Sequence, residues 1–111
     1  MWRQTGKYHA RRTTVDGITF DSRKEAARYV ELKDMEEKGL IRDLRRQVRY
    51  ELVPAFDVDG HHYRPVFYVA DFVYTEDGKE VVEDVKGMRT DVYKIKRKLF
   101  SHRYGKRIKE T

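Results

Sequence analysis

The sequence predicts an α/β protein in which a mixed central sheet is flanked by helices. Three observations predict it: two stretches with helical spacing of apolar residues, one nearly unbroken apolar run, and Asp-Gly pairs that mark hairpin turns. The order along the 111 residues is helix, three strands, helix and strand. A chain of this length supports one core, so we expect a basic arm over residues 1–12 and a single domain over residues 13–111.

Composition narrows the class of protein. The formal net charge is +6 and charged residues make up 40% of the chain, which favours solubility and attraction to polyanions. Fourteen aromatic residues (one Trp, eight Tyr, five Phe) argue against disorder. The absence of cysteine excludes disulfides and thiolate zinc sites and fits a reducing compartment. No apolar run approaches the length of a membrane span, so we expect a cytoplasmic protein with no membrane partner.

The predicted domain begins with a hairpin and a helix. Asp16-Gly17 is a two-residue turn signal between short apolar stretches, so we expect a hairpin over residues 13–20. Residues 22–38 then show helical spacing, and Gly39 follows the last predicted turn.

The start of this helix carries a candidate functional residue. Asp21 or Ser22 is the N-terminal cap, and Glu25 shares a stripe with Tyr29 and Leu32 that should face the sheet. Ser22 and Glu25 have the spacing of a capping box, in which the glutamate only stabilises the helix start. A role for Glu25 at a site on the sheet is the competing interpretation.

A first strand and a second hairpin follow the helix. Residues 41–56 predict a strand with a basic edge, and Asp59-Gly60 predicts a turn. This turn places Pro54 opposite Pro65, where neither residue can donate a ladder hydrogen bond, so we expect a bulge or splayed strands. Beyond the bulge, the register leaves open whether Gln47 or Val48 faces Asp71.

The next hairpin is the centre of the prediction. Residues 66–74 are apolar except for Asp71, as in a central strand buried on both faces. Asp77-Gly78 is the strongest hairpin signal in the chain, and its register places Asp71 directly opposite Asp84. Because side chains alternate along a strand, Lys86 shares the face of this acid pair.

Two facing carboxylates need compensation. Like charges opposite each other destabilise a sheet, and at roughly 5 Å with an effective dielectric near 20 the repulsion is on the order of 3 kcal/mol. One carboxyl keeps its proton, or Lys86 neutralises part of the charge, or a hard divalent cation lies between the two. Glu83 points to the opposite face and takes no part in this repulsion.

A second helix is predicted over residues 92–104, with Thr90 or Asp91 as its cap and Gly105 at its end. Its expected core stripe is Val92, Ile95 and Leu99, and basic residues crowd the remaining surface in a pattern that favours contact with backbone phosphates. Residues 107–110 predict a short last strand, which a right-handed crossover would add to the same sheet. The candidate nucleic-acid contacts are Arg11, Arg12, Arg45, Arg49, Lys94, Lys96, Arg97, Lys98 and Arg103.

Asp71, the run Asp84-Val85-Lys86 and the hairpin between them resemble the PD-(D/E)XK nuclease signature, with Ala70 in place of the motif's proline. The predicted order of elements matches the αβββαβ core of this restriction-endonuclease-like fold. The segments 20–22, 69–72 and 82–87 look closest to small phage-encoded nucleases, including Holliday-junction-resolving endonucleases.

This resemblance implies a metal-dependent DNA endonuclease that hydrolyses phosphodiester bonds in branched or duplex DNA during recombination, in the host cytoplasm if the chain is phage-encoded. Asp71, Asp84 and the carbonyl of Val85 would hold Mg²⁺ or Mn²⁺. Several phage nucleases of the superfamily aim a helical glutamate at the metal, which gives Glu25 its second interpretation. Lys86 would orient or deprotonate the attacking water.

Resolvases of this type cut as homodimers, although no seam of exposed apolar residues in the sequence marks an interface. The alternative function is that of a non-catalytic, basic nucleic-acid-binding protein with a nuclease-like fold.

Overall fold

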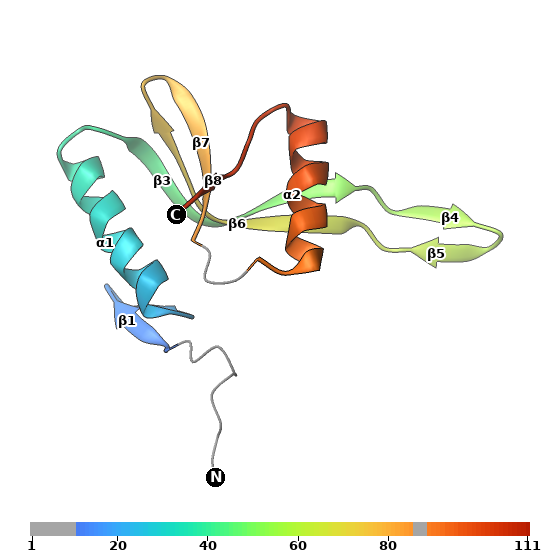
Figure 1. Ribbon diagram of the computed structural model, residues 1–111, viewed down its shortest axis with the longest axis horizontal. Helices are drawn as coiled ribbons and strands as arrows, with labels where there is room; N and C mark the ends of the chain where they lie inside the picture. The colour runs from blue at the N-terminus through green and yellow to red at the C-terminus, as the bar shows by residue number, and fades with distance from the viewer. Residues whose placement is uncertain (1–10, 86–88) are drawn as a thin grey trace, which may run out of the picture.

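The computed structural model describes residues 11–85 and 89–111 and confirms a mixed α/β fold (Figure 1). Lys86 and residues 1–10 of the predicted basic arm lie outside the described residues. The elements, in chain order, are β1 (Thr13–Val15), β2 (Ile18–Phe20), α1 (Arg23–Glu37), β3 (Arg42–Val53), β4 (Phe56–Val58), β5 (His61–Tyr63), β6 (Val66–Glu76), β7 (Lys79–Asp84), α2 (Asp91–Tyr104) and β8 (Lys109–Glu110).

The main sheet has the strand order β3-β6-β7-β8. Neighbouring strands are antiparallel except β7 and β8, which are parallel, so the sheet is mixed as predicted. The predicted last strand therefore joins the same sheet, although its ladder covers only Lys109 and Glu110.

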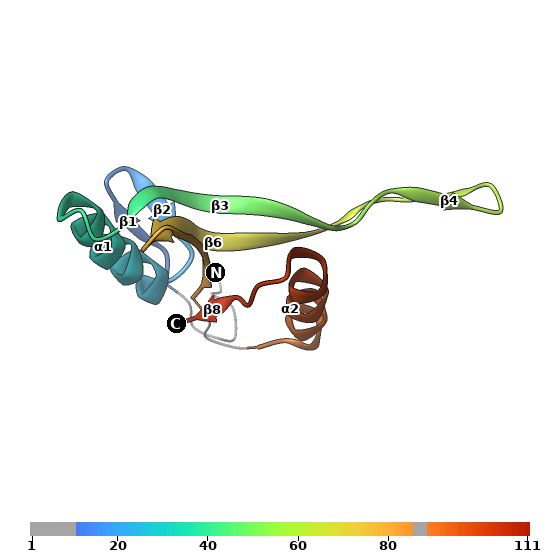
Figure 2. The same cartoon turned by 90° about the horizontal axis from the view of Figure 1, so that it is seen from above.

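Helices α1 and α2 pack on opposite faces of this sheet (Figure 2). Successive residues of a strand point to opposite faces. Phe72 and Tyr74 of β6 therefore join the buried cluster beneath α1, while Val73 joins the cluster beneath α2. β6 lies between β3 and β7, which confirms its prediction as a central strand. It is buried on both faces at residues 72–74, whereas Val66 and Val69 nearer its start are 37% and 41% exposed.

The register of the central hairpin is also confirmed. Glu76 pairs with Lys79 and Phe72 with Glu83, around a turn in which Asp77 and Gly78 have φ of 53° and 77°. Positive φ at both positions is what a type I′ turn requires, and Asp-Gly supplies it. On the other side of β6, the pairs that β3 makes before and after Gln47 place Gln47, rather than Val48, opposite Asp71.

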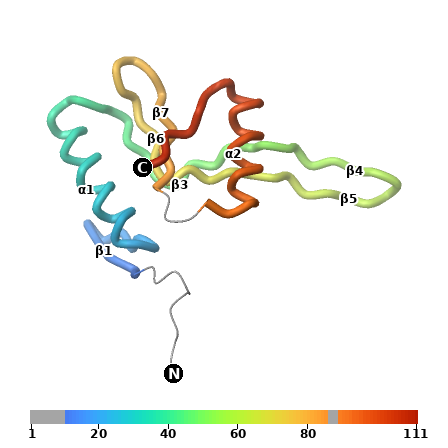
Figure 3. The backbone as a smooth tube through the Cα atoms, in the orientation of Figure 1, coloured from blue at the N-terminus to red at the C-terminus, as the bar shows by residue number. Residues whose placement is uncertain are grey.

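The two prolines interrupt the long first hairpin as expected. A register shift lies between Glu51 and Val53, and β4 and β5 resume pairing beyond Pro54 and Pro65. The β4–β5 hairpin projects from the body of the molecule, as the ribbon and the backbone tube both show (Figures 1 and 3). Neither helix in the described part of the chain is long and apolar enough to cross a membrane.

Helix α2 has the predicted limits but buries a different face. Thr90 caps it and Gly105 ends it at φ 68°, whereas Val92 and Ile95, predicted as core, are 62% and 60% exposed. Tyr93 and Phe100 are buried instead, while Leu99, the third predicted core residue, is partly buried against the same cluster. The buried stripe is shifted by one residue, or about 100° around the helix. Large rings bury more area than Val or Ile, and Phe100 packs within a cluster of tyrosine rings, so the aromatic face turns inward.

Candidate functional site

The candidate site is built on the acid pair of the central hairpin. Asp71 lies within β6 and Asp84 is the last residue of β7, in the register that makes them direct neighbours across the ladder. Asp84 is buried and accepts a hydrogen bond of 2.7 Å from the hydroxyl of Tyr68. The backbone N–H of Val85 donates to Asp71 Oδ2 at 2.9 Å. Both carboxylates are thus held by donors from their own hairpin.

Asp71 holds its proton more strongly than an ordinary aspartate does. Burial, followed by the hydrogen bond and the charge of Asp84, raises the pKa of Asp71 to about 8. The N–H of Val85 acts in the opposite direction, and the nearby charge of Glu25 adds to the rise. Of the compensations considered for the facing carboxylates, this arrangement supports retention of a proton in the metal-free protein.

Glu25 combines features of both of its interpretations. Its backbone N–H donates to Ser22 Oγ at 3.1 Å, so Ser22, rather than Asp21, is the cap of α1. Its side chain is buried beneath the helix, where Gln47 Nε2 donates to Oε2 at 3.4 Å. Gln47 has φ 52°, a left-handed conformation that costs non-glycine residues of order 1 kcal/mol or more. The charge of Glu25 reaches Asp71, yet in residues 11–85 and 89–111 no three His, Cys, Asp or Glu side chains are grouped closely enough to hold a metal ion.

The lysine that lines this site within the described residues comes from α2. A pocket of about 270 Å³ is bounded by Asp71, Asp84 and Lys96, together with Tyr68, Val69, Thr90, Val92 and Tyr93. Lys86 of the sequence motif lies outside the described residues. Sequence reasoning placed Lys96 among the phosphate contacts of the helix but not beside the acid pair. Its position follows from the rotation of α2, which no local pattern revealed.

Glu83 faces away from the acid pair, as predicted, and belongs to a buried network that sequence reasoning missed. Its carboxylate accepts two hydrogen bonds from Arg28, at 2.6 and 3.0 Å, one from Tyr74 Oη at 2.6 Å and one from Thr111 Oγ1 at 3.0 Å. Burial by itself would raise the pKa of Glu83, but the bonds from Arg28 and Tyr74 outweigh it and lower the pKa. The sequence did hold one signal for this network: a carboxylate in an apolar strand is buried, and a buried carboxylate needs a hydrogen-bonding partner.

Most of the arginines predicted to contact DNA have partners within the chain. Arg45 pairs with Glu80 at 3.2 Å, Arg97 with Glu110 at 2.7 Å and Arg103 with Glu51 at 3.4 Å, while Arg49 lies 4.0 Å above the ring of Phe67. Arg11 and Arg12 are exposed at the start of the described chain. The guanidinium charges of Arg45, Arg97 and Arg103 are thus bound to acids of the same molecule, and that of Arg49 lies against an aromatic ring.

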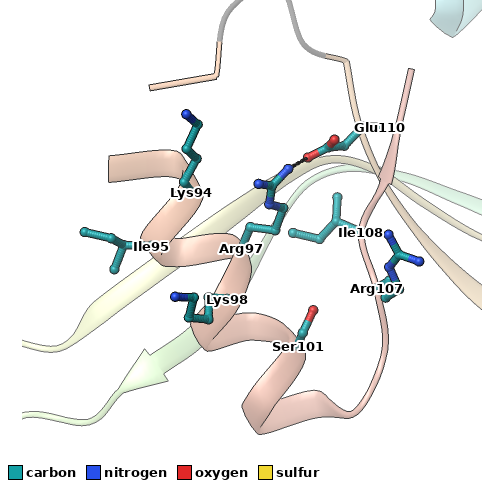
Figure 4. Close-up of a pocket in the computed structure, with 8 residues that line it drawn as sticks. All are labelled: Lys94, Ile95, Arg97, Lys98, Ser101, Arg107, Ile108 and Glu110. Atoms are coloured by element: carbon teal, nitrogen blue, oxygen red, sulfur yellow. Dashed lines mark hydrogen bonds and ion pairs between the residues drawn. The ribbon is translucent and has the colours of Figure 1, made fainter. Parts of the chain in front are cut away.

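The basic side chains of α2 divide between two flanks. Lys96 faces the acid pair, whereas Lys94, Arg97 and Lys98 line a separate pocket of about 620 Å³ between α2 and β8. In that region Arg97 turns toward Glu110, whereas Ile95 and Lys98 point away from β8 and Lys94 points toward the N-terminal end of the helix (Figure 4). The basic residues of α2 therefore do not form one continuous surface for phosphate contact.

Comparison with known proteins returns one family. The model of the family described as "Protein of unknown function (DUF1064)" matches residues 5–111. No curated protein and no solved structure matches the chain.

Proposed function

The chain belongs to the DUF1064 family, and we propose that it is a metal-dependent endonuclease that hydrolyses phosphodiester bonds in DNA, with branched DNA as its preferred substrate. The observation that carries the proposal is the contact between Asp71 and Asp84 in a pocket that Lys96 also lines. Folding alone would not favour two carboxylates in contact, because the pair costs stability unless something shares its charge.

The oxygen atoms at this site suit the Mg²⁺ or Mn²⁺ that the sequence resemblance implies. Hard divalent cations prefer carboxylate ligands, and the proton that Asp71 retains beside Asp84 is what a cation would replace. Asp71 and Asp84 would hold the ion, with Glu25 close enough to add charge and Val85 fixed against Asp71 through its N–H. When bound, the ion would supply Lewis acidity toward the phosphate oxygens.

The remaining chemistry falls to side chains of this chain. Hydrolysis joins the oxygen of water to phosphorus, breaks the bond to one sugar oxygen and delivers a proton to that leaving oxygen. Lys86 orients the attacking water, and Lys96 contacts the phosphate on which charge develops. Tyr68 keeps Asp84 in place through the hydrogen bond from its hydroxyl.

The test is cleavage of supercoiled plasmid and of labelled four-way junction, flap, duplex and single-stranded DNA by the full chain, in Mg²⁺, Mn²⁺ or EDTA. Asp71→Asn, Asp84→Asn and Lys86→Ala should each reduce cleavage at least about 100-fold while DNA binding persists. Asp77→Asn is the matched control, because it makes the same change at the exposed turn of the same hairpin. DNA binding without cleavage in either metal would favour the non-catalytic alternative, and undiminished cleavage by Asp84→Asn would reject the site.

A further inference from the structure

The β4–β5 hairpin and its flanking prolines, residues 54–65, form an arm whose two strands pair only with each other in the described part of the chain. Its side chains include large apolar groups in contact with solvent: Phe56, Val58 and Tyr63 are 43%, 50% and 45% exposed. The rings of Phe56 and Tyr63 stack at 4.8 Å, so the aromatic surface is ordered without support from the body. A projecting hairpin with exposed apolar side chains and unpaired strand edges is a surface suited to contact with another protein.

The outer surface of α2 offers a complementary chemistry. Val92 and Ile95 lie exposed on a helix whose neighbouring residues are basic. Lys94 and Lys98 flank Ile95; Ile95 and Lys98 point away from β8, and Lys94 points toward the N-terminal end of the helix (Figure 4). The rotation of α2 that buries its aromatic residues therefore creates an apolar and basic surface on the outside of the body.

The net charge of the arm indicates which kind of partner it can bind. Residues 54–65 contain two aspartates, Asp57 and Asp59, and one arginine, Arg64, so their net charge is −1 with neutral histidines. Since the whole chain has a net charge of +6, the rest of the chain has a net charge of +7. A nucleic-acid backbone repels an acidic arm, whereas the body of a second copy attracts it. We propose that the arm of one copy docks on the outer surface of α2 of a second copy, with Val58 beside Ile95 and the arm's aspartates beside Lys94 and Lys98.

A twofold symmetric pair makes this contact twice. In such a dimer each copy contributes one arm and one helix, so the buried area of a single docking is doubled. A stable interface buries about 800 Å² per partner. That is about a tenth of the 7912 Å² that the chain exposes. The proposal does not depend on nuclease activity.

The experiment is sedimentation velocity of the full chain without nucleic acid, from micromolar to hundreds of micromolar protein and at two salt concentrations. The wild type should form a dimer that weakens at high salt, because exposed charges are screened. Val58→Asp and Ile95→Asp should each raise the dimer Kd at least about tenfold. Val30→Asp is the matched control, since Val30 is 50% exposed on α1, away from both surfaces, and the dimer should tolerate it.

A charge exchange tests the pairing itself. Asp57→Lys with Asp59→Asn, and separately Lys94→Glu with Lys98→Glu, should each weaken the dimer, and a mixture of the two variants should recover association. Circular dichroism checks that each variant is folded. A wild type that stays monomeric throughout, a Kd unaffected by the arm substitutions, or a monomer whose DNA affinity falls when the arm is changed would each overturn the proposal, the last by assigning the arm to nucleic acid.

Discussion

The raised pKa of Asp71 makes the stability of the metal-free protein depend on pH in a direction that is unusual for a carboxyl group. The folded-state pKa of Asp71, about 8, lies above its ordinary value of 3.8. Between these values the folded protein binds a proton that the unfolded chain has released. The stabilisation is complete below the unfolded pKa and is lost as the pH rises through the folded pKa. Asp71→Asn imitates the protonated acid and should remove this dependence.

The size of the effect follows from linkage. Inside the window each pH unit removes up to about 1.4 kcal/mol of unfolding free energy. Asp71 is partly exposed, so solvent screens part of the effect and we take half of this value. Between about pH 5 and pH 8 the wild type should lose about 2 kcal/mol relative to Asp71→Asn. For a domain of this size the difference in Tm is about 8 °C.

Thermal unfolding followed by circular dichroism, in EDTA and across this pH range, measures the difference between the two proteins. Asp77→Asn controls for loss of a carboxylate elsewhere on the hairpin and should follow the wild type. At the upper end of the range, Mg²⁺ should raise the Tm of the wild type by mass action but barely affect Asp71→Asn. Parallel pH profiles for wild type and Asp71→Asn would refute the raised pKa of Asp71, and an equal response to Mg²⁺ would refute Asp71 as a metal ligand.

Three further substitutions test the surroundings of the pair. Glu83→Gln should lower stability by about 3 kcal/mol, measured by urea unfolding, because it weakens a buried, two-point contact with Arg28; an unchanged unfolding midpoint would contradict that role. Tyr68→Phe should cost about 1–3 kcal/mol, because it removes the donor to a buried carboxylate; equal stability in EDTA would mean that another group replaces the hydroxyl. Lys96→Ala should slow cleavage and reduce the salt slope of DNA binding by about one, whereas Lys98→Ala, on the other flank of α2, should do neither; equal effects would place the DNA across both flanks.

The features that were predicted correctly are local ones. Asp77-Gly78 sets φ at its own two positions, and once that turn is fixed the pairing of each residue in β6 and β7 follows by counting. Ser22 caps the start of α1 through a hydrogen bond to a nearby backbone N–H. Gly105 ends α2 through its left-handed backbone conformation. The facing of Asp71 and Asp84 could therefore be read from sequence alone, although they are separated by a turn.

The features that were missed depend on contacts between distant segments. In α2, Val92 with Ile95 and Tyr93 with Phe100 both have helical spacing, so periodicity could not decide which stripe is buried. The choice is made by the tyrosine rings of β3 and β6 that receive Phe100. Arg28 is 55 residues from Glu83, and no spacing rule connects them. The position of Lys96 at the acid pair follows from the same rotation of α2.

The two adjacent acids of β7 have different roles: Glu83 supports the structure, and Asp84 belongs to the proposed site. Glu83 points to one face, where bonds from Arg28, Tyr74 and Thr111 tie the strand to α1, to β6 and to the C-terminal residue. Asp84, one residue further, points to the other face and meets Asp71. A site whose carboxylates repel each other needs a rigid frame, since otherwise the strands would separate to relieve the charge. The network of Glu83 supplies that frame from the opposite side of the same strand. We therefore expect Glu83→Gln to weaken the response of the Tm to Mg²⁺ in protein that is still folded, and an undiminished response would show that the acid pair holds its geometry without this support.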